Sequence, residues 1–337
     1  MKAQPLFMEP VFKEMIWGGT ALRDVFGYDI PGDDTGECWA ISAHENGDCT
    51  VRTRNADGTP APTDLDGIKL SALYREMPAL FWGDAAEGAP ARFPILTKIL
   101  AAADDLSIQV HPDDAYAHEH ENGADGKTEC WYVIDAKPDA TIIIGHNASS
   151  KEELKQMMDE KRFKELVREI PVKKGDFFFI EAGTVHAIKA GTLILETQQN
   201  TDITYRLYDY DRLQNGKPRE LHLEKCLDVI PCPYQPKKVP HAEVRAFSNG
   251  SYIRNLVTCG LFGVNLISVT DELKICGKDV RKTFTIVSVL DGEGAITRAA
   301  DSAETWQIRK GEHMILPADF GAYTLTGNLQ IVTSWPE

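Results

Sequence analysis

The clearest pattern in the chain is an alternation of apolar and polar residues with a period of two, which places every second side chain on one face of a β-strand. Residues 107–112 show it best, because Ser107, Gln109 and His111 alternate with apolar residues. Pro112 cannot donate a backbone hydrogen bond, so we expect it to close this strand. One face of the predicted strand therefore carries only polar side chains.

Other predicted strands add polar residues that can face the same interior. They are Lys98 in 93–100, Glu129 in 126–134, Glu196 in 192–196, and Asp202 and Arg206 in 202–208. A further strand over 175–180 leads into a glycine turn that is followed by His186. We expect these strands to surround one polar interior.

The period changes after residue 149. Ser150 and Glu153 match a helical capping box, and apolar residues then recur every three or four positions as far as Ile170. This spacing predicts one amphipathic helix or two short helices, ending before Pro171. The apolar stripe is typical of core packing and indicates no cofactor.

Shorter elements complete the pattern. Short helices are predicted over 20–26, 71–77, 79–82 and 220–229. A strand over 37–44 is expected to pair with 49–52 across Asn46-Gly47, a dipeptide typical of hairpin turns.

The order of these elements predicts a mainly β protein built from two jelly-roll barrels, with the helical segment at about 150–170 inserted in the first. The proline-rich segment 231–236 is the expected linker. It separates a catalytic domain over 1–235 from a smaller β domain over 240–337. The second barrel lacks a matching set of polar residues, so we expect it to be metal-free, with His313 in a loop.

The composition and charge of the chain disfavour several classes of function. The net charge of −15 disfavours nucleic acid and anionic membranes as partners. The N-terminus has no signal-peptide pattern, and no apolar run reaches the length of about 18 residues expected of a membrane span. Seven scattered cysteines without a close pair are typical of free thiols in a reducing compartment. These features predict a cytoplasmic protein, and they give no indication of its oligomeric state.

Four polar residues of the predicted strands form a metal-ligand set. Gln109, His111, Glu129 and His186 can converge on one ion, because each comes from a separate strand or lies two positions along the same face. Imidazole and carboxylate are ligands that zinc prefers, with an amide oxygen as a weaker ligand. Iron and manganese also accept nitrogen and oxygen ligands, so they stay open at this point.

The residues that form this set also resemble a known family. The motifs are residues 107–112, 126–129, 183–187 and 196–202 leading to Arg206, and the likeness extends from Trp17-Gly18-Gly19 to residues 219–222. They resemble the type I mannose-6-phosphate isomerases in their short bacterial form. The resemblance implies a cupin fold and one zinc ion per chain, held by Gln109, His111, Glu129 and His186, with Arg206 as the active-site arginine. Glu181 departs from the family, where a proline commonly precedes the Ala-Gly turn.

The implied reaction interconverts mannose 6-phosphate and fructose 6-phosphate through an enediolate, so the expected partner is a phosphorylated hexose. Such a reaction needs an acid-base group and positive charge near two oxygens. We assign Arg206, Lys127 and Glu196 to catalysis. Ser107, Lys98 and Asp202 are assigned to substrate binding.

Some choices stay open on the sequence alone. Glu196, Asp202 and Lys127 all qualify as the proton-transfer group, and Lys127, Lys98 and Ser107 all qualify for phosphate or hydroxyl contacts. Two other functional classes would use a similar barrel. One is a cupin dioxygenase or epimerase, and the other is a sugar-binding or regulatory cupin without activity.

Overall fold

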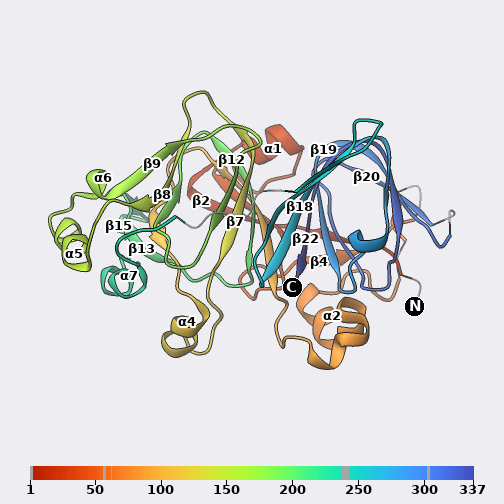
Figure 1. Cartoon of the computed structure of the whole chain (residues 1–337), viewed down its shortest axis with the longest axis horizontal. Coiled ribbons are helices and arrows are strands. Elements are labelled where there is room, and N and C mark those ends of the chain that lie inside the picture. Colours follow the sequence, from red (N-terminus) through yellow and green to blue (C-terminus); the bar gives the residue numbers. More distant parts are fainter. Residues whose placement is uncertain (1–2, 56–57, 62, 237–242, 302–303) are drawn as a thin grey trace.

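The fold is described from a computed structural model covering residues 3–55, 58–61, 63–236, 243–301 and 304–337. Strand content of 43% against 17% helix confirms the mainly β prediction. Figure 1 shows two β-rich halves side by side, with the C-terminal strands β18–β22 forming one half. The helices α4, α5 and α7 lie on the outer side of the other half.

The N-terminal half contains two antiparallel sheets. Within the described residues, one sheet has the order β10 (Phe177–Ile180), β7 (Glu129–Ala136), β12 (Thr192–Gln199), β5 (Ile95–Ala102), β3 (Thr35–Ile41) and β2 (Val11–Gly19). The other has the order β13 (Tyr205–Tyr208), β6 (Ile108–Val110), β11 (His186–Ile188), β8 (Thr141–His146) and β9 (Val167–Pro171). All polar residues assigned above lie on these two sheets or directly beside their strands.

The C-terminal half is a single antiparallel sheet that also includes two strands from the N-terminal part of the chain. Its order in the described residues is β16 (Val244–Ala246), β17 (Tyr252–Thr258), β18 (Phe262–Ile275), β22 (Tyr323–Pro336), β19 (Thr285–Arg298), β21 (His313–Leu316), β1 (Leu6–Glu9) and β4 (Thr50–Arg52), with β20 (Thr305–Arg309) on β19. Leu6 pairs with Ile315, so the start of the chain fastens the two halves together. The domain division near residue 235 stays a prediction, and β1 and β4 cross it.

The helices are short. They are α1 (Ala21–Phe26), α2 (Leu70–Glu76), α3 (Pro78–Trp82), α4 (Asp114–His120), α5 (Lys151–Asp159), α6 (Phe163–Leu166), α7 (Leu223–Val229) and the 3₁₀ turns η1 (Gly83–Gly88) and η2 (Gly277–Asp279). A small hairpin, β14 (Leu213–Gln214) with β15 (Lys217–Pro218), stands between β13 and α7. None of the helices in the described ranges is long and apolar enough to cross a membrane.

Two predictions of local structure, one for a hairpin and one for a helix, are wrong. The turn at Asn46-Gly47 forms no strand hairpin, because β3 pairs with β2 and β5 while β4 pairs with the distant β1. The helical segment ends at Leu166 and continues as β9, whose β-branched Val167 and Ile170 pair with β8. In each case pairing with a distant strand overrides the local turn or helix signal.

His313 lies on β21 and is buried, whereas a loop was predicted. The apolar residues that follow His313 extend the strand. Two partners satisfy the hydrogen-bonding capacity of the His313 ring. Its Nδ1 lies 2.9 Å from Ser288 Oγ, and its Nε2 lies 2.9 Å from Tyr28 Oη. Because Tyr28 precedes β3, this buried contact links the two halves.

An aromatic cluster also joins the halves beneath the site. Phe93, just before β5, stacks on Phe284, just before β19, with ring centroids 4.9 Å apart. Phe81 of α3 packs edge-on against both rings. All three are buried, and burial of such a side chain contributes about 1.5–3 kcal/mol. The cluster therefore fixes β5, which carries Lys98, against the C-terminal half.

Candidate metal centre and active site

Strand register brings three of the predicted residues into one row. His186 on β11 pairs with Gln109 on β6, and Gln109 pairs with Arg206 on β13. Paired residues on neighbouring antiparallel strands project from the same face of a sheet. Glu129 begins β7 on the opposing sheet, and His111 follows β6 directly. The row and the two flanking residues therefore meet between the sheets.

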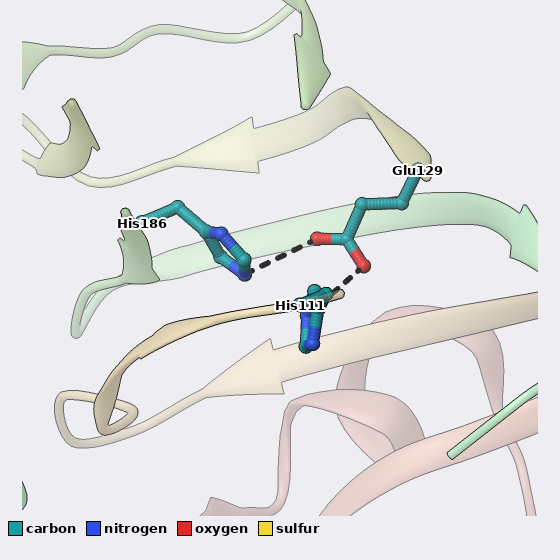
Figure 2. A group of neighbouring side chains, drawn as sticks. All are labelled: His111, Glu129 and His186. Carbon is teal, nitrogen blue, oxygen red and sulfur yellow. Dashed lines mark ion pairs between the residues drawn. The ribbon is translucent and has the colours of Figure 1, made fainter. Parts of the chain in front are cut away.

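The side chains of His111, Glu129 and His186 point toward one another, as Figure 2 shows. Glu129 Oε2 lies 3.6 Å from His111 Nε2, and Glu129 Oε1 lies 3.5 Å from His186 Nε2. One ligand atom from each residue lies within 4.8 Å of the others. All three side chains are buried.

The two imidazoles are in the form that binds metals. Burial lowers the pKa of His186 to about 4 and holds the pKa of His111 well below its usual range, so both rings are neutral at pH 7. His186 Nδ1 lies 2.8 Å from the Thr184 carbonyl oxygen, to which its N–H donates a hydrogen bond. Its Nε2 therefore presents a lone pair to the cluster.

An ion fits this arrangement. Neither nitrogen of the buried His111 ring has a hydrogen-bond partner within the described structure, which is costly for a polar group without a ligand. Ligand atoms around a tetrahedral zinc at usual bond lengths are separated by about 3.3 Å. The separations of 3.5 and 3.6 Å from Glu129 are close to that value.

Gln109 adds a fourth contact to the cluster. Its side-chain amide lies 3.3 Å from His186 Nε2 through the atom placed as Nε2, and its Oε1 accepts from Ser107 Oγ at 3.3 Å. Rotation about the last side-chain bond exchanges the amide oxygen and nitrogen. The oxygen is the atom that suits a divalent metal.

A cavity of about 440 Å³ opens beside the cluster, within the range of about 300–1,000 Å³ that is usual for small-molecule sites. It brings together all six residues that were assigned to catalysis and substrate binding. These are Lys98, Ser107, Lys127, Glu196, Asp202 and Arg206. Gln109 also lines the cavity, and His111, Glu129 and His186 are buried behind it.

Two buried lysines are engaged by carboxylates at one end of the cavity. Lys127 Nζ lies 2.9 Å from Glu129 Oε2. Burial alone would lower the pKa of Lys127, but Glu129, Glu196 and Asp202 together raise it, so the amine stays protonated. Lys98 Nζ lies within 3.9 Å of carboxylate oxygens of Glu37, Glu196 and Asp202.

The indole of Trp131 links the metal cluster to Glu196. Its Nε1 lies 3.0 Å from Glu129 Oε1 and 3.1 Å from Glu196 Oε2, so one donor is shared by two buried carboxylates. Burial and the nearby Glu129 charge raise the pKa of Glu196. A carboxyl group with a raised pKa is suited to exchanging a proton near neutral pH.

The sequence reasoning missed several residues of this cavity. Glu37 lines it and accepts from Trp39 Nε1 at 2.6 Å. The alternation within residues 35–41 could have indicated it, since Glu37 and Trp39 share a strand face. Arg219 and His222 also line the cavity, but they lie outside any strand and follow no period.

Comparison with known proteins places the chain in a family. Residues 6–147 match the model of the phosphomannose isomerase type I catalytic domain, and residues 252–336 match the mannose-6-phosphate isomerase cupin domain. The chain is 46% identical to mannose-6-phosphate isomerase ManA of Bacillus subtilis, over 99% of each chain. It belongs to the type I phosphomannose isomerases.

Other members of the type I phosphomannose isomerases agree with this assignment. The mannose-6-phosphate isomerase of Streptococcus mutans is 44% identical over 98% of each chain. A crystal structure of the mannose 6-phosphate isomerase from Bacillus subtilis superposes with a TM-score of 0.89 at 42% identity, covering 98% of this chain and 99% of that chain. The buried His-Glu-His cluster is compatible with the metal dependence of this family.

Proposed function

We propose that the chain is a zinc-dependent aldose-ketose isomerase that interconverts mannose 6-phosphate and fructose 6-phosphate through an enediolate. Membership of the type I phosphomannose isomerases supports the substrate and the reaction. The observation that carries the proposal is the buried cluster of His111, Glu129 and His186 beside a cavity lined by acid-base groups. The metal-ligand cluster and the cavity support an isomerase only in combination.

One zinc ion per chain is the proposed cofactor, held by Gln109, His111, Glu129 and His186. When bound it supplies positive charge that polarises the oxygens on C1 and C2 of the open-chain sugar. Two neutral imidazoles, one carboxylate and one amide leave that charge only partly compensated. The donor set and the separations of its ligand atoms fit zinc.

Glu196 is the proposed proton-transfer group. In the forward reaction the C2 proton is removed, its electron pair forms the C1–C2 double bond, and the π pair of the C1 carbonyl moves to O1. O1 then gains a proton, O2 loses its proton and forms the C2 carbonyl, and C1 accepts a proton. The raised pKa and full burial of Glu196 support its assignment over Asp202, whose side chain is 40% exposed. The protonated Lys127 is suited to donating a proton to a sugar oxygen rather than to accepting one from carbon.

Arg206 is proposed to stabilise the negative charge that develops on the sugar oxygens. Its place in the row with Gln109 and His186 supports this role. Ser107, Lys98 and Asp202 are proposed to contact sugar hydroxyls, because they line the same cavity. The free cysteines support the further proposal that the enzyme is cytoplasmic.

A coupled assay tests the proposal. Conversion of mannose 6-phosphate is measured on the purified protein, then after chelation, and again after addition of zinc. We expect activity that is lost on chelation and returns with zinc. A dioxygenase would need molecular oxygen for turnover, and a binding protein would show no turnover, so either result would contradict the proposed function.

A further inference from the structure

Charge is unevenly distributed within the cavity. At the Lys98 end, Glu37, Glu196 and Asp202 surround one amine, and Lys127 is paired with Glu129. A phosphoryl dianion placed there would meet several carboxylates at close range, and like charges at such distances repel strongly in a buried site. This end suits neutral hydroxyl groups better than a phosphoryl group.

Arg206, Arg219 and His222 line the cavity away from Lys98, together with Glu220. Glu220 Oε2 lies 3.9 Å from His222 Nε2, but its side chain is 83% exposed, so solvent screens its charge. The buried Nε of Arg206 has no hydrogen-bond partner among the described residues. One of its terminal nitrogens donates to the Glu220 carbonyl oxygen at 2.9 Å. A fixed guanidinium with an unused donor faces this end of the cavity.

Arg219 is held in place by a buried carboxylate. Its Nε and Nη2 donate to the two oxygens of Asp209 at 2.8 and 2.5 Å, and Asp209 is only 4% exposed. Nη1 takes no part in these bonds. The bidentate contact therefore orients the guanidinium and leaves one of its nitrogens for a ligand.

Asp209 accepts hydrogen bonds from two arginines. Arg212 also donates to Asp209 Oδ1, at 2.7 Å, so two guanidinium groups share one carboxylate. Burial and the nearby charges of Arg219 and Arg212 lower the pKa of Arg206, while the carboxylates of Asp209 and Glu220 partly offset this effect. Three guanidinium groups therefore lie near two carboxylates, one of them largely exposed, so positive charge remains for an anionic ligand.

The β14–β15 hairpin explains how Arg219 reaches the cavity. It begins directly after Arg212 and ends directly before Arg219, so Asp209 ties both ends of the hairpin together. Its turn residues Asn215 and Gly216 both have positive φ, as a tight hairpin turn requires. Asp209 thereby sets the position of Arg219 without facing the cavity itself.

His222 offers a further donor at the same end. Its Nδ1 accepts from the Arg206 backbone N–H at 3.1 Å, and burial lowers its pKa, so the neutral ring carries its proton on Nε2. Nη1 of Arg219 and Nε2 of His222 can thus both donate to an anionic oxygen.

We propose that Arg219 binds the phosphoryl group of the substrate, with His222 as a second donor beside Arg206, and that Asp209 is the residue that positions Arg219. This inference rests on the proposed function and deepens it. In this arrangement the phosphoryl group of the substrate binds near Arg219, and the sugar hydroxyl groups bind near Lys98. The β14–β15 hairpin serves to hold Arg219 at the cavity.

The test compares Arg219→Ala, Arg219→Lys and Asp209→Asn with the wild-type, zinc-loaded enzyme. Loss of a charged hydrogen bond predicts that Arg219→Ala raises KM for mannose 6-phosphate by about 10- to 100-fold. Its kcat should change by less than about 3-fold, because a uniform binding contact is lost. Lys217→Gln, which removes an exposed charge from the same hairpin, is the matched control and should leave KM unchanged.

Inhibition by mannitol 6-phosphate and by mannitol isolates the phosphoryl contribution. Wild-type enzyme should bind the phosphorylated compound more tightly, and the ratio of the two inhibition constants should shrink by about 10- to 100-fold in Arg219→Ala. Arg219→Lys should restore part of the ratio. Asp209→Asn should lower it by less than Arg219→Ala does, since the guanidinium remains but is held less firmly.

Zinc content and thermal unfolding of each variant identify any that fail to fold. An unchanged KM and an unchanged inhibitor ratio in a folded, zinc-loaded Arg219→Ala would overturn the inference while leaving the isomerase assignment intact. Failure of the wild-type enzyme to convert mannose 6-phosphate would instead overturn the proposed function. A ratio in Asp209→Asn equal to that of wild type would refute the positioning role.

Discussion

Replacing Lys98 with methionine removes one buried charge and keeps most of the side-chain volume. Lys98 Nζ lies 3.8 Å from Glu37 Oε2 and 3.9 Å from oxygens of both Glu196 and Asp202. At an effective dielectric constant of about 20, each such contact contributes about 4 kcal/mol before desolvation. Solvent screening reduces the contact with the half-exposed Asp202 to about 1 kcal/mol or less.

Desolvation of the amine offsets much of the remaining attraction. We therefore expect Lys98→Met to lower the free energy of unfolding by about 3–5 kcal/mol, the usual cost of leaving buried charges without their partner. The double variant Lys98→Met/Glu196→Gln should recover about 1–3 kcal/mol, because one of the stranded carboxylates is neutralised.

Urea unfolding of the zinc-loaded protein, followed by tryptophan fluorescence at pH 7, measures the stability lost in Lys98→Met and the stability recovered in the double variant. Lys13→Met is the matched control, because the amines of Lys13 and Lys98 both lie over the Trp39 ring, at 5.0 and 4.7 Å from its centroid. This variant should cost about 1 kcal/mol or less. A loss below about 1 kcal/mol in Lys98→Met, or no recovery in the double variant, would refute the reasoning.

Three further predictions concern single residues. Arg206→Ala should lower kcat/KM by about 10²- to 10³-fold with bound metal unchanged by elemental analysis, and survival of most activity would contradict its role. Glu129→Gln should lose most bound metal because a neutral amide replaces the only carboxylate ligand, so retention of one ion per chain would count against the ligand set. Burial lowers the pKa of His313 from 6.5 to about 3, so the unfolded chain takes up a proton below pH 6.5 that the folded chain does not. Stability should therefore fall with decreasing pH by about 1.4 kcal/mol per unit more steeply in wild type than in His313→Asn, and equal slopes in urea unfolding between pH 5 and 6.5 would contradict this.

The alternation of side chains was enough to find most of the candidate site. Gln109 and Arg206 were assigned to the interior from the period of two alone, and they line the cavity. This worked because a strand with one face toward a polar interior must place its polar residues at every second position. His111 and Glu129 followed from the same rule together with ligand chemistry, whereas His186 was indicated by the glycine turn that follows residues 175–180.

Features that depend on distant partners could not be predicted in this way. The pairing of β4 with β1 and the strand β9 arise from sheet edges that no local pattern describes. Arg219 enters the cavity because Asp209 ties the two ends of a hairpin together, and its neighbours follow no period. His313 is satisfied by Tyr28, a residue almost the whole chain away.

Anomalous diffraction from crystals of the purified protein, recorded on both sides of the zinc absorption edge, tests the metal centre most directly. We expect a single strong peak in each chain, present only above the edge, about 2.0–2.2 Å from Gln109 Oε1, His111 Nε2, Glu129 and His186 Nε2. No peak among these side chains in an enzyme that still converts mannose 6-phosphate would contradict the proposed metal site.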